Sequence, residues 1–176
     1  MIRIAIQRCC TTPILIKQYE TSTDSVLFTL GIKSIDISGL GCCGYPLKNF
    51  NLNAYVLSSG KNISLAEKEG LDILTFCNGC YLSLKQADYY LKNHKDIRNY
   101  TNSILSKEGL NYQGSAKIFH LLHYLYSVRD RIEESINSRF SGLKVATHYG
   151  CQVLRPRDVI DFTKHSPLYS SIDLWS

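Results

Sequence analysis

The sequence predicts an α/β fold: a Rossmann-like parallel sheet joined by crossover helices, with cysteine loops at the C-terminal ends of the strands. Three observations point to it. Short apolar segments of strand length recur along the 176 residues, helical patterns follow most of them, and cysteines stand directly after four of them. Strands that alternate with helices favour a parallel sheet, because right-handed crossover connections place the helices on its two faces.

Five segments have the length and the aliphatic content of strands. They are Arg3–Gln7, Lys33–Ile37, Asp72–Phe76, Lys117–Phe119 and Leu143–Thr147. Apolar residues three and four positions apart predict helices over Tyr19–Leu30, Leu52–Glu69, Tyr81–Leu91, Ile97–Lys107 and Leu121–Ile136. Gly31, Gly70 and Gly142 end three of these helical segments, and glycine is common directly after a helix.

Composition and charge narrow the functional class. Hydrophobic residues make up 44% and charged residues 20% of the chain, which is typical of a soluble globular protein. No apolar stretch is long enough to span a bilayer, and the N-terminus has no signal-peptide pattern, so we expect a cytoplasmic protein. The net charge is +5 without any run of like charges, which disfavours a nucleic-acid patch. A loose C-terminal group of basic residues suits a solvated face or an acidic electron-carrier subunit; it comprises Arg139, Lys144, Arg155, Arg157 and Lys164.

The seven cysteines are the main functional signal. They are arranged as Cys9-Cys10, Cys42-Cys43-Gly44, Cys77-Asn78-Gly79-Cys80 and Cys151, each group directly after a predicted strand. Their odd number and adjacent pairs disfavour a disulfide framework and favour a reducing compartment. Ligands of open α/β sheets bind beyond the carboxyl ends of the strands, and thiolates are soft donors for zinc, copper(I) and iron–sulfur clusters. We therefore expect thiols from three loops to converge on one inorganic centre.

Three kinds of centre compete for this pattern. A Cys-x-x-Cys turn alone serves structural zinc, thioredoxin-like exchange and iron–sulfur clusters. Simple dithiol exchange leaves Cys42 and Cys43 without a role, and structural zinc sites usually contain two Cys-x-x-Cys knuckles, of which the chain has one. Adjacent thiolates suit a larger cluster, in which neighbouring sulfurs bind different irons or one sulfur bridges two. Zinc and dithiol exchange remain the weaker alternatives.

The complete spacing resembles the cysteine-rich CCG domains of the heterodisulfide reductase B subunit and its relatives, including iron–sulfur subunits of glycolate- and glycerol-3-phosphate-oxidising complexes. Between Cys10 and Cys42 lie 31 residues, and between Cys43 and Cys77 lie 33. The segment Cys10-Thr11-Thr12-Pro13 is similar to the family's opening, with Cys9 in place of its usual glycine. His148-Tyr149-Gly150-Cys151 is similar to the segment that opens a second CCG unit.

This resemblance implies a noncubane [4Fe-4S] cluster held by Cys10, Cys42, Cys43, Cys77 and Cys80, with Cys9 and Cys151 as further candidates. It implies an oxidoreductase acting on a sulfur group, which reduces a disulfide of the CoM-S-S-CoB type at that cluster. The implied partners are the ferredoxin-like C subunit and the flavin-bearing A subunit of a heterodisulfide reductase-type complex. The implied boundaries are a CCG domain over residues 1–142 and the incomplete start of a second unit over 143–176, so that activity of this chain alone is uncertain.

Two other functions fit the same residues. One is electron transfer within a hydroxy-acid or glycerol-3-phosphate dehydrogenase complex, and the other is a non-catalytic, zinc-stabilised interaction module. Further polar residues are weaker candidates. His148 and Tyr149 could donate protons near the sulfur chemistry, although a structural pair is the simpler interpretation. Packing or solvation likewise explains two other pairs more simply than ligand binding does: His120 with His123, and Arg155 with Arg157.

Overall fold

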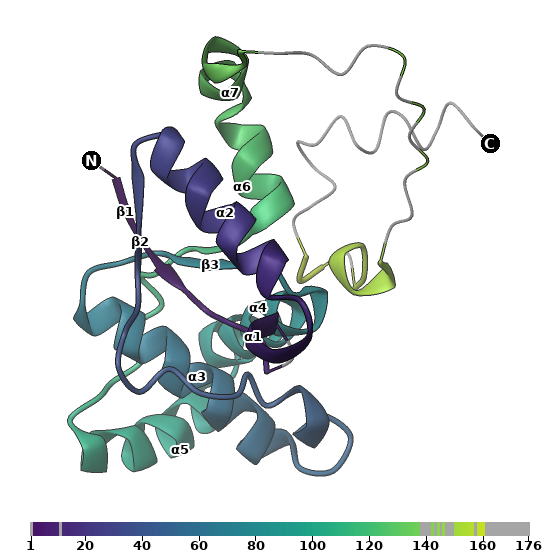
Figure 1. The fold of residues 1–176 in the computed structure, drawn as a ribbon. Coiled ribbons are helices and arrows are strands. Elements are labelled where there is room, and N and C mark those ends of the chain that lie inside the picture. The colour runs from purple at the N-terminus through teal and green to yellow at the C-terminus, as the bar shows by residue number, and fades with distance from the viewer. Residues whose placement is uncertain are drawn as a thin grey trace.

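The fold is built around a four-stranded, all-parallel sheet, which confirms the predicted α/β class (Figure 1). The structure is a computed structural model that describes residues 2–10, 12–137, 142, 144, 146, 150–156 and 158–160. The strand order is β2-β1-β3-β4, with strands β1 (Ile2–Ile6), β2 (Ile32–Ile35), β3 (Ile73–Thr75) and β4 (Ile118–His120). The predicted fifth strand, Leu143–Thr147, lies largely outside the described residues.

The strand register places the three cysteine loops at one edge. Ile4 of β1 pairs with Ser34 of β2, and Ala5 of β1 pairs with Ile73 of β3. Because all the strands run in the same direction, the segments that follow β1, β2 and β3 leave the sheet on the same side. The order reverses direction at β1, so the loops after β1 and β3 flank the crevice where ligands of such sheets bind.

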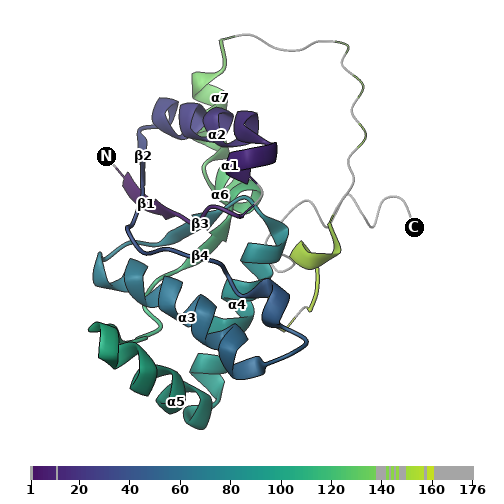
Figure 2. The ribbon, with the colours of Figure 1, turned by 60° about the horizontal axis from the view of Figure 1, so that its bottom comes forward.

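Helices cover both faces of the sheet (Figures 1 and 2). On one face lie α2 (Lys17–Thr29), α6 (Leu121–Ser127) and α7 (Arg129–Ser135); on the other lie α3 (Leu52–Lys68), α4 (Asn78–Asn93) and α5 (Lys95–Leu105). Alternation along β1 divides the core: Ile4 and Ile6 pack beneath α2 and α6, whereas Ala5 packs with α3 and α4. A four-residue helix, α1 (Thr12–Leu15), precedes α2.

The helix predicted over Leu121–Ile136 forms as two helices. The backbone leaves the helical region at Val128, where φ is −114° and ψ is 21°. The Val128 N–H donates to the Leu125 carbonyl, three residues back, so the α-helical hydrogen-bond ladder is interrupted there. The predicted helix over Ile97–Lys107 begins earlier, at Lys95, and passes into the 3₁₀ turn η2 (Ser106–Glu108).

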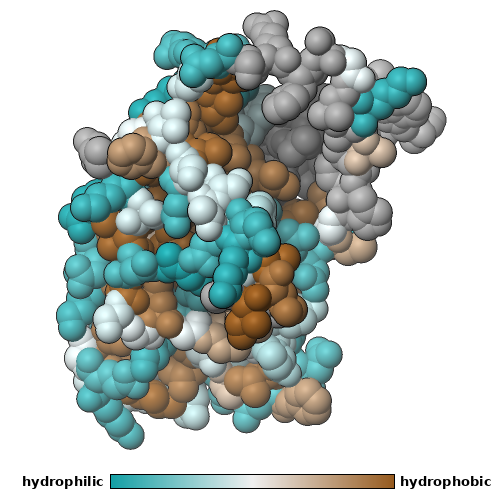
Figure 3. Space-filling view, viewed as in Figure 1, coloured by the Kyte–Doolittle hydropathy of each residue, from teal (hydrophilic) through white to brown (hydrophobic). Residues whose placement is uncertain are grey.

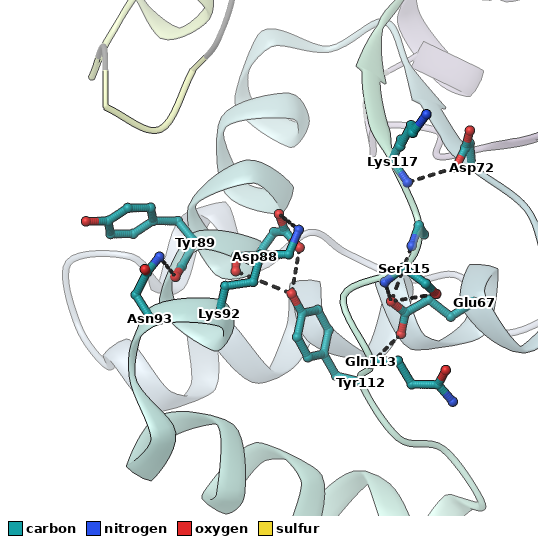
Figure 4. A network of polar contacts seen from close by, with 11 residues as sticks. Glu67, Asp72, Asp88, Tyr89, Lys92, Asn93, Tyr112, Gln113, Ser115 and Lys117 are labelled. Atoms are coloured by element: carbon teal, nitrogen blue, oxygen red, sulfur yellow. Dashed lines mark hydrogen bonds and ion pairs between the residues drawn. The ribbon is translucent and has the colours of Figure 1, made fainter.

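A polar network fixes the loop before β4 to α3 and α4 (Figure 4). The Glu67 carboxylate accepts hydrogen bonds from the backbone N–H groups of Gln113 (2.8 Å) and Ser115 (2.6 Å). The Tyr112 hydroxyl donates to Asp88 Oδ1 at 2.6 Å, and burial together with this hydrogen bond raises the pKa of Tyr112. These contacts hold the loop that enters β4. This loop therefore lies away from the edge of the sheet that carries the cysteines.

The described C-terminal segment packs against the face of the sheet that α3, α4 and α5 cover. Val153, in the 3₁₀ turn η3 (Cys151–Val153), and Ile160 are buried in the core formed with α3, α4 and α5. Gln152 Nε2 donates to the Tyr45 hydroxyl, which lies just after the Cys42-Cys43-Gly44 turn. Among the described residues, no helix is long and apolar enough to cross a membrane.

Candidate metal centre

Four cysteine side chains gather at the carboxyl edge of the sheet. Cys9, Cys43 and Cys80 are buried and pack together, and the partly buried Cys77 packs against them. They come from three separate loops: Cys9 follows β1, Cys43 follows β2, and Cys77 and Cys80 stand at the start of α4, directly after β3. Three of the predicted ligands, Cys43, Cys77 and Cys80, are therefore side by side.

The two adjacent pairs divide between the interior and the surface. In the second pair Cys43 is 5% exposed, whereas Cys42 is solvent-exposed; in the first pair Cys9 is 6% exposed and Cys10 is solvent-exposed. Successive side chains of an extended segment point in opposite directions, so one thiol of each pair turns inward. The predicted ligands Cys10 and Cys42 are thus at the surface, and the inward thiol of the first loop belongs to Cys9.

Three buried polar side chains hold the Cys42-Cys43 turn. The Asn62 side chain accepts from the Gly41 N–H (3.0 Å) and donates to the carbonyls of Gly41 (3.1 Å) and Cys42 (3.3 Å). The Ser59 hydroxyl donates to the Cys43 carbonyl at 2.6 Å. Gln7, at the end of β1, donates to the Gly41 carbonyl at 2.8 Å and so connects the first cysteine loop to the second.

Backbone N–H groups point at sulfur in all three loops. Thr12 N–H donates to Cys9 Sγ (3.3 Å), Gly44 N–H to Cys42 Sγ (3.4 Å), Tyr45 N–H to Cys43, and the Gly79 and Cys80 N–H groups to Cys77. The last two donors belong to the first turn of α4, whose N-terminus carries a partial positive charge. Such donors stabilise thiolates, and they are among the groups that set the potential of thiolate-bound iron.

The packed thiols share protons unequally. The pKa of Cys77 is lowered to about 5 and that of Cys43 to about 6, in both cases chiefly by a hydrogen bond from the Cys80 thiol. Burial opposes both shifts. The pKa of Cys80 is raised above the ordinary thiol value, first by hydrogen bonding with Cys43, then by hydrogen bonding with Cys77 and by burial. The lowered pKa values of Cys43 and Cys77 favour the thiolate, which is the form that binds metals.

Glycines allow the loops to approach closely. Gly44 has φ +81°, and a Cβ added there would lie 2.9 Å from Ser58 Cβ and 3.0 Å from the Tyr55 carbonyl oxygen. A Cβ at Gly79 would contact Cys77 Sγ at 3.8 Å and Tyr45 Cδ2 at 3.7 Å. The left-handed conformation and the contact with α3 together explain why the residue after Cys43 is glycine.

Two polar atoms of the elements that carry the cysteine loops are buried without a hydrogen-bond partner: Gln7 Oε1, just after β1, and Ser83 Oγ, on α4. Ser83, on α4, is fully buried beside the Cys43 thiol and the Tyr55 hydroxyl, and its hydroxyl lowers the pKa of both groups. A buried unsatisfied group in a folded protein indicates a missing partner, such as a bound ion or water. Soft thiol donors, N–H groups aimed at sulfur and an unused hydroxyl together fit an iron–sulfur group.

The remaining sequence candidates lie elsewhere. Among the described residues, no three His, Cys, Asp or Glu side chains are arranged to hold a single metal ion. His120 is buried at the end of β4, where its Nδ1 accepts from the Leu122 N–H at 3.3 Å; burial, and then the charge of His123, lowers its pKa to about 4. Cys151 and Arg155 are exposed. The candidates His148, Tyr149 and Arg157 lie outside the described residues.

Sequence reasoning missed the residues that hold the loop. Ser59 and Asn62 lie on the buried face of α3 between Tyr55 and Ile63, and both are at most 1% exposed. Polar residues within the apolar stripe of a helix were the available signal, because a buried polar group needs a partner. The partner here is loop backbone, which periodicity alone does not identify.

Comparison with known proteins agrees with this geometry. Residues 4–85 match the CCG family, described as a cysteine-rich domain. The chain is 35% identical over 160 residues to the B subunit of the ferredoxin/F420H2-dependent CoB-CoM heterodisulfide reductase of Methanosarcina acetivorans, covering 89% of this chain and 53% of that protein. It is 31% identical to a protein of Archaeoglobus profundus named as similar to the heterodisulfide reductase B subunit, over 84% of this chain and 51% of that protein.

Two other proteins are similar to this chain. One carries a name with a different function, and the other has a lower sequence identity. The 8-methylmenaquinol:fumarate reductase membrane anchor subunit of Wolinella succinogenes is 32% identical, over 81% of this chain and 50% of that protein. The crystal structure of a hypothetical protein from Helicobacter pylori superimposes with a TM-score of 0.64 at 23% identity, over 70% of this chain and 25% of that chain, and supports the fold.

The curated relatives are longer than this chain, which spans about half of their length. Within that half, the sequence similarity includes the three loops whose thiols pack together. Residues 4–85 of this chain match the cysteine-rich CCG domain, and most of the chain is similar to heterodisulfide reductase B subunits.

Proposed function

We propose that this chain is the iron–sulfur subunit of a multi-subunit oxidoreductase that reduces a disulfide of the CoM-S-S-CoB type. The observation that carries the proposal is the buried group of thiols from three loops, with backbone N–H donors on sulfur that lower the pKa of two of them. Relatives whose names identify them as B subunits of heterodisulfide reductases support the same reaction.

The proposed ligands of a noncubane [4Fe-4S] cluster are Cys10, Cys42, Cys43, Cys77 and Cys80. Packing supports Cys43, Cys77 and Cys80 directly. In the first loop the sequence motif indicates Cys10 as the ligand. The geometry instead favours Cys9, whose Sγ accepts a hydrogen bond from the Thr12 N–H. Serine replacements made singly at Cys9 and Cys10 decide between them, because only the ligand's replacement removes iron.

When bound, such a group supplies an iron that can take up a substrate sulfur and deliver electrons one at a time. The protein contributes a partly buried, positively polarised site: α4 directs its N-terminal N–H groups at Cys77, and Asn62 and Ser59 hold the turn that bears Cys42 and Cys43. The overall reaction consumes two electrons and two protons and converts one disulfide into two thiols. We propose a ferredoxin-like C subunit and a flavin-bearing A subunit as the electron source.

We further propose that residues 1–142 form one CCG unit and 143–176 begin a second. The curated relatives are roughly twice as long as this chain, which leaves room in them for a second unit. The seven free cysteines suit a reducing compartment such as the cytoplasm.

A second candidate function is electron transfer in a complex with another substrate, such as a hydroxy acid or glycerol 3-phosphate. The similarity to a component of an 8-methylmenaquinol:fumarate reductase favours it, because that protein's name specifies no disulfide substrate. A zinc-stabilised interaction module is the non-catalytic alternative.

Metal analysis separates these functions. The protein is purified without oxygen and assayed for iron, acid-labile sulfide and zinc. The proposal predicts about four irons with matching sulfide per chain, whereas about one zinc without iron would indicate the interaction module. Turnover of the CoM-S-S-CoB heterodisulfide by the iron-loaded protein with reduced viologen, with and without its partner subunits, then tests the substrate. Iron without turnover in the complete assembly favours the electron-transfer alternative.

A further inference from the structure

Of the four packed cysteines, one reaches the surface. Cys9, Cys43 and Cys80 are at most 6% exposed, whereas Cys77 is partly exposed. On the side of the first loop, the first residue of α1, Thr12, is 1% exposed, and its hydroxyl lies 2.6 Å from Cys9 Sγ. Figure 3 shows an apolar surface over the position of this helix. A molecule that approaches the thiol group from solvent therefore meets Cys77 first.

Two side chains meet beside Cys77. Tyr45 begins the 3₁₀ turn η1 (Tyr45–Leu47), and Gln152 lies in η3, 107 residues further along the chain. Gln152 Nε2 donates a hydrogen bond to the Tyr45 hydroxyl. A Cβ placed on Gly79 would lie 3.5 Å from Gln152 Oε1, 3.7 Å from Tyr45 Cδ2 and 3.8 Å from Cys77 Sγ. The phenol ring, the amide and the partly exposed sulfur thus surround one small space at Gly79.

Anchored backbone carries both side chains. Tyr45 follows Gly44, whose left-handed conformation (φ +81°) shapes the turn. In η3, Val153 is 3% exposed in the core, and its N–H donates to the Gly150 carbonyl at 3.2 Å. Glycine at position 150 lets this segment lie against Asn78 of the Cys-x-x-Cys turn, because a Cβ there would overlap the Asn78 side chain. The two segments are therefore held independently, and the hydrogen bond between them fixes the position of the phenol ring.

We propose that Tyr45 is a cap over Cys77, positioned by Gln152, and that this cap admits only narrow sulfur-containing molecules to the thiol group. The proposal rests on the proposed function for the class of substrate, a disulfide, and adds the residue that limits its width. Tyr45 is 39% exposed, so the ring is available to an approaching molecule while its Cδ2 edge faces the space at Gly79. A wide group next to the substrate sulfur would have to displace the ring, and forcing extra atoms into a packed site costs free energy.

A purely structural role for the pair fits the observations less well. The C-terminal segment is held without the pair, since Val153 and Ile160 are buried in the core. Tyr45 belongs to neither of the two hydrophobic clusters that the described residues form on the faces of the sheet. A large side chain that is outside the core, yet is fixed beside a thiol, is better explained by contact with a ligand.

Thiol labelling of the iron-free, reduced protein tests the cap. The reagents are N-methylmaleimide and N-(1-pyrenyl)maleimide, which share one reacting group and carry no charge but differ in width; mass spectrometry of the peptides assigns each site. The ratio of the two rates at one cysteine cancels its thiolate fraction and reports access alone. The exposed Cys10 provides the reference ratio in the same sample. At Cys77 the wide reagent should be slower than this reference by about tenfold or more.

Variants of the pair should move the ratio in both directions. Tyr45→Ala should bring the Cys77 ratio to within about twofold of the Cys10 reference. Gln152→Ala should do part of this, and the double variant should do no more than Tyr45→Ala, because Gln152 acts through the ring. Gly79→Ala should slow the wide reagent further, since its methyl group would fill the space between the three side chains.

Matched controls are Tyr89→Ala and Gln113→Ala. Tyr89 has the same exposed fraction as Tyr45, 39%, but lies toward the C-terminal end of α4, and Gln113 lies on the loop before β4. Both variants should keep the parent ratio. Circular dichroism confirms folding, and iron is measured separately after anaerobic reconstitution. Absence of iron in the parent would overturn the proposed function, whereas the labelling ratios, which need no iron, decide the cap.

Three results would overturn the cap itself. They are equal ratios at Cys77 and Cys10 in the parent protein, an unchanged Cys77 ratio in Tyr45→Ala, and an equal change of that ratio in Tyr89→Ala. An unchanged ratio in Gln152→Ala, with the expected change in Tyr45→Ala, would overturn the positioning role of Gln152.

Discussion

Asn62→Ala should destabilise the protein and release the cluster together. The Asn62 side chain is 1% exposed and makes three hydrogen bonds to the turn that bears Cys42 and Cys43. At about 1 kcal/mol for each buried hydrogen bond, with part of the backbone left without partners, the loss is about 3 kcal/mol. For a chain of this size that corresponds to a fall in melting temperature of roughly 6–12 °C.

A second asparagine supplies the matched control. Asn102 Oδ1 accepts from the Tyr112 N–H at 2.9 Å, and its Nδ2 donates to the Tyr112 carbonyl at 3.3 Å, so it clamps backbone in the same way but far along the chain from the cysteines. Asn102→Ala should lower the free energy of unfolding by about 2 kcal/mol by the same reasoning. It should leave the iron content unchanged.

The assays are urea unfolding of the iron-free, reduced chain and iron content after anaerobic reconstitution. The expected pattern is a loss of stability in both variants but a loss of iron in Asn62→Ala alone. Full iron retention by Asn62→Ala, or equal iron loss in both variants, would show that the clamp does not position the cysteines.

Three further outcomes follow from the site. In the iron-free reduced protein, alkylation of the partly exposed Cys77 by iodoacetamide should keep its rate at pH 6.5 and slow only as the pH falls through about 5, because its lowered pKa keeps it ionised; a profile like that of N-acetylcysteine would contradict this. Gly44→Ala should cost about 2 kcal/mol more than Gly70→Ala, since both have positive φ but only Gly44 lacks space for a methyl group; equal unfolding midpoints would refute it. Ser83→Ala should lower the reduction potential of the reconstituted protein in a redox titration, because its hydroxyl is available to donate toward sulfur; an unchanged potential would leave Ser83 without that role.

The sequence predicted the sheet and the edge that carries the site because both depend on local patterns. Ile4 and Ile6 alternate with Ala5 and so give a strand buried on both faces, and the cysteines lie in the loops that follow β1, β2 and β3. Parallel strands place such loops on one side, so the convergence of thiols followed from topology. The break at Val128 was not predicted, because the apolar spacing continues through it.

The orientation of individual thiols could not be predicted. Which member of an adjacent pair turns inward depends on the phase of the extended loop, and that phase is set by the hydrogen bonds that the loop makes in the folded protein. For Cys43 these come from Ser59 and Asn62, 16 and 20 or more residues along the chain. For Cys9 the local contact with Thr12 sets the orientation of the side chain. This contact turns Cys9 into the interior, although the motif had indicated Cys10 as the ligand.

The central claim is that thiols from three loops bind one multi-iron centre, and iron content after single cysteine-to-serine replacement tests it most directly. Cys43→Ser, Cys77→Ser and Cys80→Ser should each lose most of the iron and its absorbance, because each removes a sulfur from the packed group, whereas Cys151→Ser should keep both. Full iron in any of the first three variants, or its loss only in Cys151→Ser, would contradict the account.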